Sequence, residues 1–144
     1  MTAPFHRPVM AALACAAALA FAAPASAETV AMKAELKASN EVPPADSKGS
    51  GAVTTTYDTA TKKLTWKGGY SGLTGAATAA HFHAGEAGKN GGVVIPIGGA
   101  DKSPFEGSAT LTDAQAADLM AGRLYVNIHT AANKGGEIRG QVVK

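Results

Sequence analysis

Cysteine is almost absent from this chain of 144 residues: Cys15 is the only one, and it lies in an alanine-rich stretch near the N-terminus. A domain that begins after residue 27 therefore cannot be braced by disulfides. A structural zinc site made of cysteine thiolates is excluded there for the same reason. Such a domain must rely on its hydrophobic core, for which the remaining length is sufficient.

Charge is also scarce. Charged residues make up 17% of the chain, and the formal net charge is +2. Removal of Arg7 with an N-terminal leader would leave 12 basic and 11 acidic side chains, with no long run of either sign. This balance gives no reason to expect a nucleic acid or a charged membrane surface as partner.

Long apolar segments are limited to the N-terminus, where Arg7 precedes an apolar run over Val9–Ala23. The run is too short for a stable membrane anchor and is typical of a secretory signal. Ala25-Ser26-Ala27 offers the small residues that signal peptidase requires, so cleavage is predicted between Ala27 and Glu28. We expect residues 1–27 to be a cleavable signal peptide, residues 28–144 to be the mature domain, and the location to be periplasmic or secreted.

Two alternatives to cleavage remain. One is an uncleaved N-terminal membrane helix, which the short apolar run disfavours. The other is a lipoprotein modified at Cys15, which would leave too few apolar residues before the cysteine. After cleavage at Ala27, no membrane anchor is expected.

Strand patterns dominate residues 28–144. Apolar and polar residues alternate with the period of two that a half-buried strand requires, and turn residues separate the segments. About eight such segments predict an all-β fold, an antiparallel Greek-key β-sandwich of the superoxide-dismutase or immunoglobulin type, with Trp66 and Phe82 buried. The expected strands are 30–36, 52–57, 64–70, 79–84, 93–97, 105–111, 124–129 and 137–143.

One short helix is expected over Asp113–Ala121. Thr112 is a good N-cap, and Gln115 three residues later completes a capping-box pattern. Gly122 fits the position just after a helix end.

Histidine is rare and unevenly placed: His6 lies in the leader, and the other three are His81, His83 and His129. His81 and His83 are two residues apart, so both project from the same face of a strand. His129 ends a later strand and could converge with them. Imidazole suits copper, zinc, iron or nickel, and three ligands leave one position open. The sequence therefore predicts a metal site at these histidines; the alternative is three histidines with ordinary hydrogen bonds.

Arg139 is expected near this site. If the last hairpin closes around residues 132–134, Asn127 pairs with Arg139, which then lies on the same side as His129. A cation there could attract small anions to a metal. A surface salt bridge with Glu137 or Glu86 is the alternative.

Five motifs together resemble the CHRD domain, which occurs as repeats in chordin and singly in exported bacterial proteins. They are NEVPP at 40–44, AHFHAG at 80–85, GGVV at 91–94, GRLYVNIHT at 122–130 and GGEIRGQ at 135–141. The resemblance extends over about residues 31–143. In chordin the repeats belong to an extracellular antagonist of growth factors, which implies a non-enzymatic interaction module.

A looser resemblance connects the chain with the copper/zinc superoxide dismutases, which are also Greek-key sandwiches. His81 and His83 match that family's strand-borne copper ligands, His129 its late copper ligand, and Arg139 its anion-guiding catalytic arginine. No histidine matches the bridging or zinc ligands, and the family's disulfide cysteines are absent. This resemblance implies a copper site without zinc.

The preferred hypothesis is an exported CHRD protein that binds copper through His81, His83 and His129, for metal handling or redox chemistry. If it is an enzyme, a copper-dependent oxidoreductase of the superoxide-dismutase type is expected, with Arg139 as its catalytic residue. The alternative is an extracellular protein-interaction module without metal, whose partner the sequence does not identify. A hydrolase is poorly supported, because no Ser-His-Asp arrangement stands out.

Overall fold

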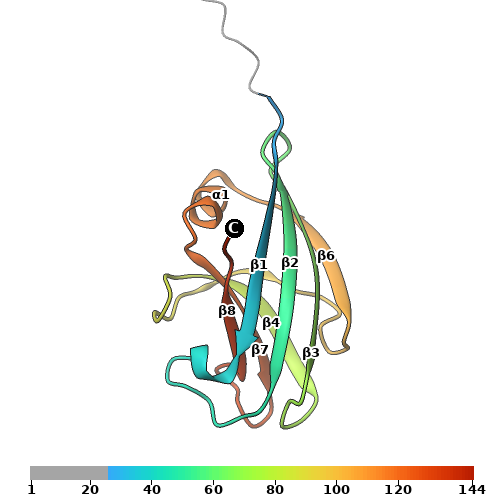
Figure 1. The fold of residues 1–144 in the computed structure, drawn as a ribbon, viewed down its shortest axis with the longest axis vertical. Helices are drawn as coiled ribbons and strands as arrows, with labels where there is room; N and C mark the ends of the chain where they lie inside the picture. Colours follow the sequence, from blue (N-terminus) through green and yellow to red (C-terminus); the bar gives the residue numbers. More distant parts are fainter. Residues whose placement is uncertain (1–25) are drawn as a thin grey trace, which may run out of the picture.

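The computed structural model describes residues 26–144, which form eight β-strands, one α-helix and one short 3₁₀ helix (Figure 1). The predicted signal peptide, apart from Ser26 and Ala27, lies outside the described residues. Within them, no helix has the length and apolarity needed to cross a membrane. The elements are β1 (Thr29–Lys37), η1 (Ala38–Asn40), β2 (Ser50–Asp58), β3 (Lys63–Ser71), β4 (Ala77–Ala84), β5 (Val93–Pro96), β6 (Phe105–Thr110), α1 (Asp113–Met120), β7 (Leu124–Thr130) and β8 (Ile138–Gln141).

The strands pair antiparallel in one sheet with the order β5-β4-β7-β8-β1-β2-β3-β6. β3 pairs with β6, and β4 pairs with β7, so each pair joins strands three positions apart along the chain. Such non-sequential pairing is the Greek-key arrangement. The predicted all-β antiparallel fold with one short helix is therefore confirmed.

The sheet folds over so that its two halves enclose the core. Figure 1 shows β1, β2, β3 and β6 side by side with β4 and β7 behind them. Trp66 of β3 packs edge-to-face on Phe82 of β4, with ring centroids 5.1 Å apart, although these two strands are not paired. Trp66 is 3% exposed and Phe82 is fully buried, as predicted.

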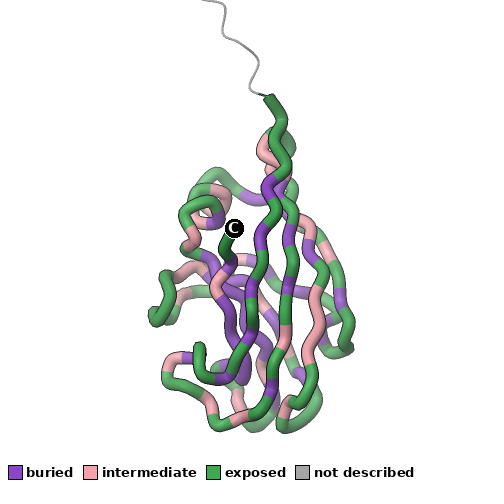
Figure 2. The backbone as a smooth tube through the Cα atoms, in the orientation of Figure 1, coloured by how far each residue is buried: buried purple, intermediate pink, exposed green. Residues whose placement is uncertain are grey.

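The alternation of apolar and polar residues along the sequence explains why these segments form strands. In β1 every second residue is buried, and Figure 2 shows buried and exposed positions alternating along β1 and β2. One face of each strand is thereby removed from water, which is the main favourable term in folding. The buried residues of β1 are Val30, Met32, Ala34 and Leu36.

Helix α1 begins with the predicted capping box. The Thr112 hydroxyl accepts a hydrogen bond from the Gln115 backbone N–H at 3.2 Å, and the Gln115 side chain accepts one from the Thr112 N–H at 3.0 Å. The helix ends at Met120, one residue earlier than expected, and Gly122 follows with a φ of +70°. Glycine adopts this left-handed conformation without steric cost.

The last strand is shorter than predicted. The expected segment 137–143 contains β8 only over Ile138–Gln141. Val142 then donates its N–H to the Leu124 carbonyl, and Val143 bonds to Lys33 of β1. Val142 thus still bonds to β7, and the chain turns to β1 at Val143, which ends the ladder with β7.

Glu137 precedes β8 and fastens three loops to the sheet. Its carboxylate is fully buried and accepts hydrogen bonds from the Ser47, Thr74 and Thr130 hydroxyls at 2.6–2.7 Å. The Thr74 N–H and the Asn133 side-chain amide also donate to it, at 2.7 and 3.2 Å. Burial opposes ionisation, but these hydrogen bonds outweigh it and hold the pKa of Glu137 at about 2.

Replacing Glu137 by glutamine is expected to weaken the fold and to change its response to acid. The pKa of a glutamate in an unfolded chain is about 4.3, so the wild-type carboxylate contributes stability above that pH and loses it as the pH falls towards 2. We expect an acid-dependent loss of about 3 kcal/mol in the wild type that is absent in Glu137→Gln. At neutral pH the variant should be at least about 2 kcal/mol less stable, because buried donors lose their acceptor.

Urea unfolding between pH 7 and 2 measures both effects. Glu106→Gln, which alters an exposed carboxylate on the edge strand β6, is the control and should follow the wild type. An unchanged acid-dependent loss in Glu137→Gln would show that other carboxylates cause it.

Candidate metal centre

The outer face of β4, β7 and β8 carries the residues singled out in the sequence. Phe82 points into the core, so the flanking His81 and His83 project outward. Pairing places His81 opposite Asn127 of β7, and Asn127 opposite Arg139 of β8. This is the register expected from the last hairpin, and it puts the histidines and Arg139 on one face.

The three histidines converge at one end of this face. His81 Nδ1 lies 3.1 Å from His129 Nε2, and one nitrogen from each of the three rings lies within 4.8 Å of the others. Two nitrogens at 3.1 Å, each about 2.0–2.1 Å from a shared ion, subtend an angle of about 95–100° at it. The spacing fits direct ligation of one metal ion, and without an ion it is also the distance of a hydrogen bond between the His81 and His129 rings.

Backbone carbonyls fix the protonation of two rings. His83 Nδ1 lies 2.9 Å from the Gly91 carbonyl, and His129 Nδ1 lies 2.8 Å from the Lys134 carbonyl. A carbonyl only accepts, so both Nδ1 atoms carry the proton and both Nε2 atoms present a lone pair. His83 Nε2 is buried and has no hydrogen-bond partner among residues 26–144. This unpaired atom could donate its lone pair to a metal ion.

The His81 and His83 rings are also held in their neutral form. Burial is the main effect and lowers the pKa of both; neighbouring imidazoles lower both further, while the Gly91 carbonyl and the Asn127 side chain act in the opposite direction on His83. Both rings are therefore neutral at pH 7, which is the state that binds a metal.

The loop after β4 orients His83. The Tyr125 ring stacks on the His83 imidazole, with centroids 4.8 Å apart and planes 6° apart, and its hydroxyl accepts from the Gly91 N–H at 3.2 Å. A Cβ on Gly91 would lie 1.4 Å from the Ala84 carbonyl oxygen, so only glycine fits there. Sequence reasoning did not identify Tyr125, although its place opposite His83 follows from the strand pairing.

Arg139 is 2% exposed and binds the same loop. Its guanidinium donates to the Asn90 side-chain oxygen at 3.1 Å, to the Glu86 carbonyl at 3.2 Å and to the Lys89 carbonyl. Its Cζ lies 3.4 Å from the centroid of the Tyr125 ring. β4 and β8 flank β7 on opposite sides, so His83 and Arg139 contact opposite faces of that ring.

The surface salt bridge considered for Arg139 is not formed. Within the described part of the chain, neither the Glu137 nor the Glu86 carboxylate lies within 4.0 Å of the guanidinium; ion pairs there join other residues. Glu86 contributes its backbone carbonyl instead. That Arg139 guides an anion to a metal stays a prediction.

A family model for the CHRD domain matches residues 32–142. The chain belongs to the CHRD domain family. No curated protein and no solved structure matches the chain. In this CHRD domain the matched range contains all three histidines and Arg139. The looser likeness to copper/zinc superoxide dismutases rests on the histidine and arginine pattern alone.

Substitution of Gly91 tests how the CHRD domain orients His83. In Gly91→Ala the new methyl group would collide with the Ala84 carbonyl, so the loop must move and the Gly91 carbonyl must leave His83 Nδ1. We expect His83 to lose its preference for the Nδ1–H tautomer, which ¹⁵N NMR of the imidazole measures. Gly92→Ala, with open space around the added carbon, is the matched control. An Nδ1–H tautomer that persists in Gly91→Ala would contradict this account.

Proposed function

We propose that this CHRD domain is an exported copper-binding protein whose ligands are His81, His83 and His129. The observation that carries the proposal is the convergence of the three rings, together with a buried His83 Nε2 that has no hydrogen-bond partner in the described chain. An unsatisfied buried acceptor costs about 1–3 kcal/mol. A metal ion bound there would remove that cost and would use the lone pairs of all three rings.

Copper suits this donor set best. All three ligands are neutral nitrogens, and copper(II) has the highest affinity among the common divalent metals for such sites. Three protein ligands leave an open position, and His81 and His129 are only partly buried, so a small molecule or a second protein could reach the ion. The site therefore supports copper handling or redox chemistry. A superoxide-dismutase-like activity, with Arg139 drawing the anion towards the ion, is the enzymatic form of this proposal.

Copper titration followed by tryptophan fluorescence is the direct test. Trp66 is the only tryptophan, and it packs on Phe82, which lies between His81 and His83 in β4. Copper(II) should quench this fluorescence saturably and bind more tightly than zinc, nickel or cobalt. His81→Ala and His83→Ala should each abolish tight binding, because two ligands cannot complete the site.

Thr78→Ala, an exposed change on the same strand, is the control and should bind copper like the wild type. Electron paramagnetic resonance of the copper form should report nitrogen ligands. Equal copper affinity in the wild type and in His83→Ala would refute the metal proposal. The metal-free interaction module would then be the better account.

Export is the second part of the proposal. Its support is the sequence of residues 1–27, and the predicted cleavage site lies directly before Glu28, whose backbone already bonds to Thr59. Removal of residues 1–27 would thus leave every described strand intact.

Expression of the full chain in a bacterium with a periplasm tests export. We expect a periplasmic protein whose mass and N-terminal sequence begin at Glu28. Ala27→Gln should block cleavage, because signal peptidase needs a small residue there, whereas Ser26→Gln at the tolerant position between the two alanines should be processed normally. Cytoplasmic protein that retains Met1 in the wild type would contradict the proposal.

A further inference from the structure

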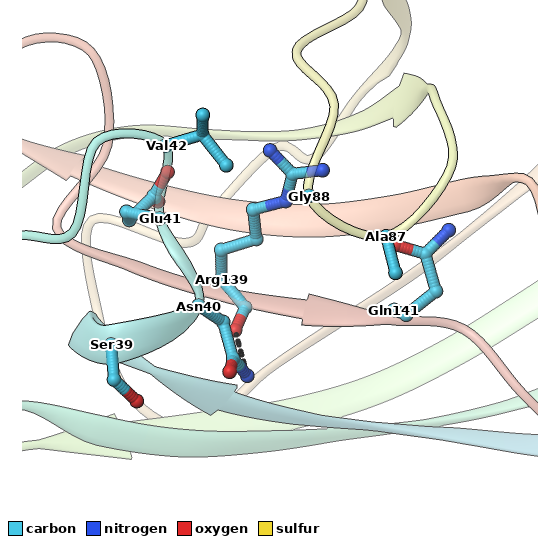
Figure 3. A pocket seen from close by; sticks show the side chains of 8 residues that line it. All are labelled: Ser39, Asn40, Glu41, Val42, Ala87, Gly88, Arg139 and Gln141. Carbon is cyan, nitrogen blue, oxygen red and sulfur yellow. Dashed lines mark hydrogen bonds between the residues drawn. The ribbon is translucent and has the colours of Figure 1, made fainter.

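A cavity of about 340 Å³ lies beside the metal centre on the outer face of β8. The segment Ser39–Val42 and the loop residues Ala87 and Gly88 form its walls, and Arg139 and Gln141 project from β8 between them (Figure 3). None of the three histidines lines it. Its volume is at the lower end of the range for small-molecule sites.

Arg139 brings a buried positive charge to this cavity. Its three hydrogen bonds go to two carbonyls and one amide oxygen, all of them neutral. Its Nε makes no hydrogen bond within residues 26–144 and is free to donate. A buried guanidinium without a counterion is costly, and a carboxylate can pair with it through a charge-assisted hydrogen bond from the free Nε–H.

Glu41 does not fully compensate this charge. Its side chain is 5% exposed, and its Oε1 has no hydrogen-bond partner in the described chain. Burial raises the pKa of Glu41 to about 7, although Arg139 and Asn127 act in the opposite direction. The carboxyl group is therefore protonated in a large fraction of molecules at neutral pH, which leaves the cavity positive.

Two amide oxygens complete the cavity. Gln141 uses its side-chain N–H groups on the Gly85 and Gly122 carbonyls, at 2.8 and 2.7 Å, and its oxygen remains free. Asn40 uses its side-chain amide on the Arg139 carbonyl at 3.0 Å, which likewise leaves its oxygen free. The cavity thus combines one cationic donor with neutral acceptors.

We infer that this cavity binds a small organic acid that carries a hydroxyl or ammonium group next to its carboxylate. The carboxylate pairs with the Arg139 guanidinium, and the neighbouring donor group reaches the amide oxygen of Gln141. Hydroxy acids and amino acids share this chemistry. None of the residues that line the cavity is a proposed copper ligand, so binding is testable on metal-free protein.

NMR titration of the chelator-treated protein tests the inference. Glycolate, glycine, acetate and ethanolamine are added separately, and the Arg139 Nε–H and Gly88 amide signals are followed. Glycolate, glycine or both should shift these signals saturably and bind at least about threefold more tightly than acetate, which lacks the second donor. Ethanolamine, which lacks the carboxylate, should leave them unchanged.

Two variants locate the site. Ala87→Phe should fill the cavity from its exposed wall and weaken binding at least about tenfold, while the control Ala60→Phe in the β2–β3 turn should bind like the wild type. Arg139→Lys should also weaken binding, because lysine has no planar guanidinium and no Nε–H at that place. No saturable shift with either glycolate or glycine up to about 10 mM would overturn the inference. Equal affinity for acetate, or undiminished binding in Ala87→Phe, would overturn it as well.

Discussion

Antiparallel pairing of β7 with both β4 and β8 places Asn127 between His81 and Arg139 in one row. A slip of one residue in β4 would turn Phe82 outward and drive the two flanking imidazoles into the core. The fully buried Phe82 and Ile128 make that exchange costly, because a large apolar area would return to water and two polar rings would lose their partners. The apolar residues of the inner face thus determine which side chains project from the outer face.

Two buried charged groups hold the loops to this sheet, in a domain whose described part has no cysteine. Arg139 binds the loop that follows β4, and Glu137 binds the loops around Ser47, Thr74 and Asn133. Both of these segments also orient a histidine. The loop bound by Arg139 contains Gly91, whose carbonyl contacts His83. The turn bound by Glu137 contains Lys134, whose carbonyl contacts His129. Hydrogen bonds to buried charges therefore do here what disulfides do in many exported domains.

Much of this arrangement could be predicted from local pattern. Alternation identified the strands, the Thr112–Gln115 box identified the helix, and the two-residue spacing of His81 and His83 put both on one face. The rest depends on contacts between distant segments. No periodic signal in the chain marks the short β8 or the stacking of Tyr125 on His83. The same is true of the burial of Glu41, which lies beside residues nearly a hundred positions away in the sequence. The tautomers depend on loop carbonyls, which every residue type carries, so no side-chain motif reveals them.

Tyr125 contacts both the histidine cluster, through His83, and the cavity residue Arg139. Its ring separates the His83 imidazole from the Arg139 guanidinium, whose Cζ is 3.4 Å from the ring centroid. Burial lowers the pKa of His83, and the charge of Arg139 adds to that effect, so the guanidinium's field reaches the proposed ligand. A carboxylate bound to Arg139 would offset this charge and favour a cation at His83. By linkage, a copper ion at the histidines would strengthen binding of the acid by the same factor. On these grounds the two proposed sites would act as one electrostatically coupled unit, although no histidine lines the cavity.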